Sequence, residues 1–279
     1  MEQWRILPFG KAGAAENMAV DEAVFRVHIR RRNPPTLRFY GWQSPALSIG
    51  YFQDYDREVD SDACGQFGVE VVRRATGGKA VLHEQELTYA VIAGADHPLF
   101  PADILKSYRV ISGCIANGLA GIGIRALMEA DGREPTAGTL RSSCFSFPSR
   151  YELLVGGRKI CGSAQMRSQG VFLQHGSLLL AFDPLRTCLV MLPHRDMARH
   201  ADLLRNAVTS VREQAGPAVE EEGLCRHLRE GFEETLGIRF AEGDLTPEEV
   251  ELRDELMAKK YENEGWNREG RKNEWISGL

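Results

Sequence analysis

Apolar residues recur with helical spacing near the start of the chain and then give way to strand-like runs. In NMAVDEAVFRVHIRR (17–31) they return every three or four positions, which predicts an amphipathic helix. The runs TLRFYGW (36–42) and ALSIGYFQ (46–53) are separated by a Ser-Pro pair and predict two strands joined by a turn. A helix therefore precedes a sheet.

The next region alternates short apolar runs with turn residues. VEVVRR (69–74), KAVLH (79–83) and LTYAVIA (87–93) predict three strands in an antiparallel meander. A helical pattern follows over 102–123, and then a loop rich in Pro, Ser and Thr over 132–149.

A second antiparallel unit is predicted over residues 151–182. It divides into three strands, with turns at Gly156-Gly157 and near Gln169-Gly170. Beyond Asp183 the pattern becomes helical, and Thr246 opens a capping-box sequence. We expect a main domain over 1–216 and a helix-rich C-terminal appendage, packed on it, over 217–279.

Composition limits the class of protein. The 279 residues are 43% hydrophobic and carry a net charge of -5, so the overall field does not favour nucleic acid. No stretch approaches eighteen consecutive apolar residues, and the N-terminus lacks a signal-peptide pattern. We expect a soluble cytoplasmic protein whose six cysteines are reduced.

The segment RRATGGKAVLHEQELTYA (73–90) carries the first candidate chemistry. Arg73, Arg74 and Lys79 flank the pair Gly77-Gly78, where a backbone could approach a phosphate or carboxylate closely. The segment matches neither phosphate-binding glycine motif. Taken alone, it also fits a plain hairpin turn, and a single histidine such as His83 also fits a structural role.

Cys144 is the second candidate, because it stands among small polar residues in RSSCFSFPS (141–149). A partly exposed thiol near a cation can become a nucleophile, and arginines flank this one at 141 and 150. Cys161 is a rival, since Lys159 lies two residues away and would share its side of a regular strand. Either cysteine also fits a role as a small buried residue.

Three long blocks carry a resemblance to a known superfamily. RRATGGKAVLHEQELTYAVI, SSCFSFPSRYELLVGGRKICGSAQ and GVFLQHGSLLL, in this order, resemble the lipoate-protein ligase and octanoyltransferase superfamily, most nearly the octanoyltransferases of Gram-positive bacteria. The likeness covers nearly the whole chain. It implies an α/β (α+β) fold with mixed, largely antiparallel sheets flanked by helices, shared with biotin protein ligases.

The resemblance also implies roles for individual residues. Cys144 would be the nucleophile that carries the acyl group, and Lys159 the lysine that lowers the pKa of its thiol and moves protons. The residues implied to line the acyl and carrier pocket are Arg73, Gly77, Gly78, His83, Gly162, Ser163, Ala164, His175 and Gly176.

The chain departs from the ATP-using ligases of the superfamily in two places. Those ligases typically carry Gly-Asn after a His-Asp pair, where this chain has Glu84-Gln85-Glu86 after His83, and they lack a cysteine matching Cys144. An acyl thioester is already activated, so a cysteine can accept it without ATP. We therefore expect no ATP, metal or other cofactor, because the donor brings its own phosphopantetheine arm.

The implied function is transfer of octanoyl from octanoyl-acyl carrier protein to a lysine of a lipoyl domain, that of the glycine cleavage H protein. Three alternatives stay open: an amidotransferase that takes octanoyl from the H protein, an ATP-dependent lipoate ligase, and a non-catalytic lipoyl-domain binder. We expect no nucleic-acid or membrane partner, and a monomer.

Overall fold

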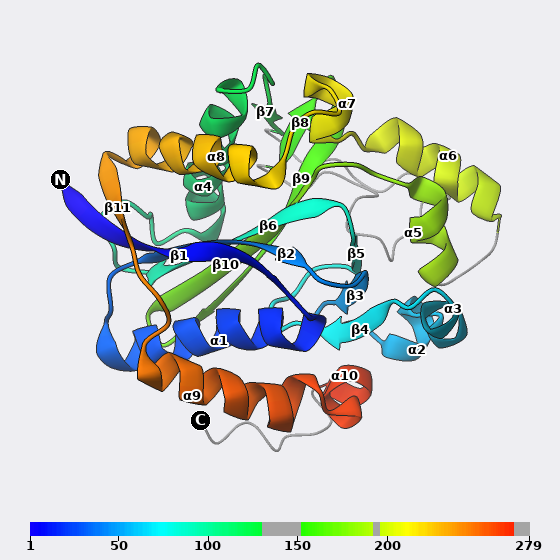
Figure 1. The fold of residues 1–279 in the computed structure, drawn as a ribbon, viewed down its shortest axis with the longest axis horizontal. Coiled ribbons are helices and arrows are strands. Elements are labelled where there is room, and N and C mark those ends of the chain that lie inside the picture. The colour runs from blue at the N-terminus through cyan, green and yellow to red at the C-terminus, as the bar shows by residue number, and fades with distance from the viewer. Residues whose placement is uncertain (130–151, 192–195, 271–279) are drawn as a thin grey trace.

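The protein is built around a large mixed sheet that helices cover on both faces (Figure 1). The computed structural model describes residues 1–129, 152–191 and 196–270. The strand order is β11-β1-β2-β6-β10-β9-β8-β7. These strands are β1 (Glu2–Ala12), β2 (Thr36–Trp42), β6 (Glu86–Gly94), β7 (Leu127–Met128), β8 (Leu153–Val155), β9 (Arg158–Ser168), β10 (Val171–Leu179) and β11 (Ile238–Glu242). The predicted fold class is confirmed.

The centre of this sheet is antiparallel and one edge is parallel. β10 pairs with β6 and β9, and β6 with β2, all antiparallel, whereas β1 runs parallel to both β2 and β11. In β10, His175 lies between Ala90 of β6 and Ala164 of β9. Segments far apart in sequence therefore meet along the middle of β10.

Each face of the large sheet has its own apolar core, because side chains alternate along a strand. On one face Phe39, Tyr89 and Phe172 pack against α4 and α8, and on the other Ile92 and Leu173 pack against α1 and α9. Figure 1 shows the two pairs of helices on opposite sides of the sheet. The helices are α1 (Ala14–Arg31), α2 (Tyr55–Glu58), α3 (Ser61–Gln66), α4 (Ile104–Ala120), α5 (Pro184–Val190), α6 (Met197–Ala207), α7 (Val211–Ala215), α8 (Glu221–Leu236), α9 (Pro247–Leu256), the π-helical turn η1 (Met257–Tyr261) and α10 (Glu264–Glu269).

A second, three-stranded sheet corrects one expectation. β3 (Ala46–Ile49) lies between β4 (Glu70–Arg73), which is parallel to it, and β5 (Val81–His83), which is antiparallel. The predicted meander over residues 69–93 is therefore wrong, because β4 and β5 both pair with β3 and β6 joins the large sheet. All four residues of β3 are buried, as expected of a central strand.

The region after residue 216 shares the cores of the preceding region. β11 extends the large sheet beside β1, α8 packs on α4, and α9 packs on α1. The Arg5 guanidinium of β1 bonds both carboxylate oxygens of Glu249, at 2.7 and 2.6 Å. The described part of this region holds α8, β11, α9, η1 and α10, and the division of the chain into a domain and an appendage after residue 216 stays a prediction.

Membrane-spanning helices are absent from the described part of the chain. No helix there combines the length and the apolar character needed to cross a bilayer.

Close packing of α4 on α8 gives a test of the fold. A methyl group at Gly231 would overlap backbone atoms of Cys114 and Gly118, whereas at Gly223, on the same helix, it would meet nothing within 4 Å. We expect Gly231→Ala to lower the free energy of unfolding by about 1–3 kcal/mol. Gly223→Ala should raise it by up to about 1 kcal/mol through helix propensity. Chemical denaturation of both variants measures the difference, and equal effects would contradict the packing.

Candidate functional site

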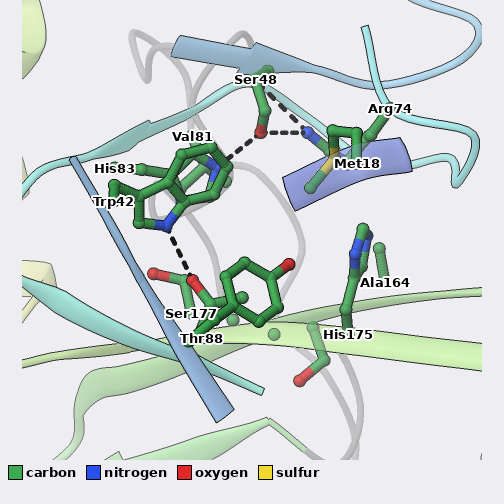
Figure 2. A pocket seen from close by; sticks show the side chains of 14 residues that line it. Met18, Trp42, Ser48, Arg74, Val81, His83, Thr88, Ala164, His175 and Ser177 are labelled. Carbon is green, nitrogen blue, oxygen red and sulfur yellow. Dashed lines mark hydrogen bonds between the residues drawn. The ribbon is translucent and has the colours of Figure 1, made fainter. Parts of the chain in front are cut away.

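A cavity lies where the two sheets and α1 meet (Figure 2). Its walls come from α1, from the small sheet and the segment after β4, and from four strands of the large sheet. The lining residues are Met18, Tyr40, Trp42, Ser48, Arg74, Val81, His83, Thr88, Gly162, Ser163, Ala164, His175, Gly176 and Ser177. Six of the nine residues predicted to line a pocket are among them: His83, Gly162, Ser163, Ala164, His175 and Gly176.

Gly176 is required by close packing across the sheet. A Cβ at this position would lie 2.5 Å from Cε1 of Tyr89 and 2.7 Å from Oγ of Ser163. The Tyr89 hydroxyl bonds the Ser163 hydroxyl at 2.7 Å and accepts a hydrogen bond from Gln174. The absence of a side chain at Gly176 therefore brings the Tyr89 ring against the cavity wall.

The Gly77-Gly78 pair lies beside the cavity and does not line it. Gly78 has φ +93°, which favours glycine, and a Cβ there would lie 3.6 Å from Cβ of Ala164 and 2.8 Å from Nη2 of Arg74. A Cβ at Gly50 would overlap the Gly78 carbonyl oxygen. The loop thus packs directly on the end of β3.

Arg73 does not line this cavity, and this corrects its expected place. Its Nη1 donates to the carbonyls of Gly50, Tyr51 and Gln53, and its other nitrogens donate to the carbonyls of Trp266 and Arg268. It therefore ties the loop after β3 to α10.

Arg74 is the arginine that reaches the cavity, because neighbouring residues of an extended chain point in opposite directions. Its guanidinium bonds the Gly77 and Lys79 carbonyls and the Ser48 hydroxyl, the last at 3.0 Å. Arg74 thus holds the glycine loop from inside.

Glu86 is a site residue that the sequence prediction missed. Its buried carboxylate accepts hydrogen bonds from His83 Nδ1 (2.7 Å), Trp42 Nε1 (3.2 Å), Thr88 Oγ1 (2.6 Å) and the Ser177 hydroxyl. Burial by itself raises the pKa of a carboxyl group, but His83 and the hydroxyl donors outweigh it and hold the pKa of Glu86 below its usual range. The sequence does contain a clue to this role, because Glu86 lies only three residues after His83.

His83 continues this network into the cavity. Its Nε2 lies 2.7 Å from the Ser48 hydroxyl, and its ring stacks on Trp42 with centroids 4.1 Å apart. Figure 2 shows the Trp42 indole against His83 and the link from His83 to Ser48.

His175 of β10 belongs to a second hydrogen-bond network, which includes Asp21 of α1. Its Nε2 lies 2.7 Å from the Thr76 hydroxyl and its Nδ1 3.3 Å from Asp21, which also pairs with Arg38 at 2.7 Å. Burial lowers the pKa of His175, against the opposing effect of Asp21, so the ring is neutral near pH 7. His175 thereby fastens the residue before Gly77 to the large sheet.

The hydrogen-bond networks of Glu86 and Asp21 determine which kind of chemical group the cavity can bind. Most lining residues are polar, but their polar atoms bond one another behind the wall, and the surface that faces the space is mostly carbon. Met18, Val81 and Ala164 add further apolar groups. An alkyl chain fits such a wall, because burying it leaves no polar group without a partner.

Lys159 is fully buried near the start of β9. Its Nζ donates to Glu152 at 2.7 Å, and the Glu152 side chain is buried as well. Lys159 is therefore not an exposed charge of the Gly156-Gly157 turn. Cys144, its predicted partner, lies outside the described residues.

The five described cysteines are poor nucleophiles. Burial raises the pKa of each thiol, to about 12 for Cys161 despite the nearby Lys159, and to about 11 for Cys64. Cys161 therefore stays a thiol near pH 7 in this arrangement. Cys144 is the one cysteine whose surroundings are not described here.

Comparison with known proteins gives the family. Residues 13–233 match the lipoyl protein ligase A/B catalytic domain. The octanoyltransferase LipM of Kyrpidia tusciae is 46% identical over 274 residues, which cover 96% of this chain and 99% of that one. The chain belongs to the LipM family of octanoyltransferases.

Solved structures extend this likeness to the fold. A bipartite lipoate protein ligase of Thermoplasma acidophilum aligns over 99% of this chain and 100% of its own, with a TM-score of 0.82 and 28% identity. A lipoate-protein ligase A bound with ATP aligns over 97% and 100%, with a TM-score of 0.78 and 29% identity. The chain thus shares its fold with lipoate protein ligases, one of which was solved with ATP bound.

The contact between Gly50 and Gly78 predicts how the site depends on the Gly77-Gly78 loop. In Gly50→Ala the new methyl group must push the Gly78 carbonyl away, which shifts the loop beside Ala164. A displacement of this kind should lower kcat/KM for acyl transfer by about 10²-fold. Gly65→Ala, where a Cβ meets nothing within 4 Å, is the control. Full activity of Gly50→Ala with an unchanged melting temperature would show that the loop does not form the site.

Proposed function

We propose that this protein transfers an octanoyl group from octanoyl-acyl carrier protein to a lysine of a lipoyl domain, that of the glycine cleavage H protein. The observation that carries the proposal is the nearly full-length 46% identity to an octanoyltransferase, against 28–29% to the lipoate ligases. The carbon-lined cavity supports it, because an octanoyl chain is apolar.

The first step exchanges one thioester for another. The Cys144 thiolate attacks the carbonyl carbon of the octanoyl thioester on the phosphopantetheine arm, a new C–S bond forms, and the arm leaves as its thiolate. The two thioesters have similar energies, so the step needs no ATP. The acceptor amine then attacks the Cys144 thioester, and formation of the more stable amide drives the second step.

Lys159 is proposed to act on Cys144 by its charge. The Glu152 carboxylate holds the Lys159 ammonium at 2.7 Å, and a positive charge beside a thiol favours the thiolate. The pairing with Glu152 fixes the position of this charge.

Three alternative functions must be distinguished from this octanoyl transfer. An amidotransferase would take octanoyl from the H protein, a ligase would use free lipoic or octanoic acid with ATP, and a binding protein would only hold lipoyl domains. Of these three alternatives, the ligase is the one that a structural likeness supports. The lipoate-protein ligase A bound with ATP aligns with this chain at a TM-score of 0.78.

Donor choice separates these functions. The protein is incubated with a lipoyl domain and one donor at a time: octanoyl-acyl carrier protein, octanoyl-H protein, or octanoic acid with and without ATP. We expect a gain of one octanoyl group on the acceptor from octanoyl-acyl carrier protein without ATP, read by intact mass. Product formed only from the free acid with ATP would instead identify a ligase, and no product from any donor a binding protein.

Removal of the Lys159 charge should raise the pKa of the Cys144 thiol towards the free value of about 8.5. Lys159→Ala and Lys159→Arg should both lower transfer, because the buried position beside Glu152 leaves little room for a guanidinium. The pH dependence of Cys144 alkylation by iodoacetamide measures the thiol pKa.

Arg158→Ala is the matched control, since Arg158 pairs with Glu213 at the surface. Identical thiol pKa values in wild type and Lys159→Ala would contradict the electrostatic role.

A further inference from the structure

Amide formation needs a proton acceptor, and this requirement rests on the function proposed above. A free lysine amine has a pKa of about 10.4, so the acceptor arrives as an ammonium near pH 7 and must lose a proton before it attacks. Lys159 is poorly suited to take a proton, because its ammonium group has only donors and already bonds Glu152. The base must therefore be sought elsewhere in the site.

Ser48, His83 and Glu86 form a chain of hydrogen bonds that ends at the cavity. Ser48 and His83 both line the cavity, and the Ser48 hydroxyl accepts from Arg74 Nη1 at 3.0 Å. Arg74 can only donate, so the Ser48 proton is available to donate to His83 Nε2 at 2.7 Å. His83 Nδ1 then carries the other proton and donates it to Glu86. The arrangement leaves Nε2 as the proton-accepting atom.

The Glu86 carboxylate lies in direct contact with His83 Nδ1. Hydrogen bonds to the Glu86 carboxylate come from His83 and from the neutral groups of Trp42, Thr88 and Ser177 within the described chain. Its negative charge is thus available to stabilise an imidazolium at His83. Arg74, which reaches Ser48, acts in the opposite direction, as does a charge on His175.

The other histidine of the cavity lacks this arrangement. Asp21, the carboxylate beside His175, already pairs with Arg38 at 2.7 Å and accepts from the Tyr40 hydroxyl at 2.9 Å. Its contact to His175 is longer, at 3.3 Å. Because Arg38 and Tyr40 already bond the Asp21 carboxylate, Asp21 would stabilise a cationic His175 only weakly.

We propose that the Ser48–His83–Glu86 chain accepts the proton of the acceptor amine in the second step. One proton of the acceptor ammonium passes to Ser48 Oγ while the Ser48 proton passes to His83 Nε2, and the imidazolium later releases a proton to water. The neutral amine that results attacks the carbonyl carbon of the Cys144 thioester, and a C–N bond forms as the C–S bond breaks. The electron pair of the broken bond stays on Cys144, whose thiolate takes up the second proton that the nitrogen loses, so the products are the amide and the Cys144 thiol.

The test measures the two steps separately. Octanoyl-enzyme is prepared from octanoyl-acyl carrier protein, its formation is followed by intact mass, and it is then mixed with a lipoyl domain in a single turnover. In Ser48→Ala, His83→Gln and Glu86→Gln, amide formation should slow by about 10²-fold more than acylation of the enzyme does. In His83→Gln the pH dependence of the second step should also change, because the proton-accepting nitrogen is lost.

A second acceptor distinguishes proton transfer from damage to the fold. Hydroxylamine is uncharged near pH 7, so its reaction with the octanoyl-enzyme should be nearly equal in the variants and the wild type. His28→Gln, a buried histidine on α1 outside the cavity wall, is the matched control.

Equal second-step rates with the lipoyl domain, an unchanged pH profile in His83→Gln, or equal losses in both steps would overturn the proton-acceptor role alone. No octanoyl-enzyme in the wild type would overturn the proposed function, and this inference with it.

Discussion

The buried carboxylate of Glu86 holds the two sheets together at the site. It receives hydrogen bonds from Trp42 on β2, His83 on β5, Thr88 on β6 and Ser177 on β10, so one side chain joins a strand of the small sheet to three strands of the large one. Burying a charge is costly unless its hydrogen bonds are satisfied. These donors meet that requirement, and the position of the cavity between the sheets follows from it.

The same principle shapes the rest of the cavity. Asp21 bonds Arg38, Tyr40 and His175, just as Glu86 bonds its own donors. In each network the polar atoms bond one another and not the open space of the cavity. The mostly carbon surface that faces the cavity suits an alkyl chain, and His83 and His175 are part of this wall. Outside the cavity, Arg73 bonds five backbone carbonyls and ties the glycine-loop side of the site to the C-terminal helices.

Local patterns predicted much of this arrangement, and long-range pairing explains what they missed. The apolar periodicity identified α1 and the strands β9 and β10, and the resemblance named six residues of the cavity wall. The meander failed because insertion of β3 between β4 and β5 is a non-local event. The choice of Arg73 over Arg74 failed because a shift of one residue reverses the direction of a side chain. β11 went unpredicted, because its five residues form a strand only beside β1.

The proposed mechanism depends most on which residue carries the acyl group between donor and acceptor. The most direct measurement is peptide mapping by mass spectrometry after the protein is mixed with octanoyl-acyl carrier protein and no acceptor. We expect one octanoyl thioester, on the peptide that contains Cys144, and its loss in Cys144→Ser. An octanoyl group on Cys161, or full transfer activity in Cys144→Ser, would contradict it.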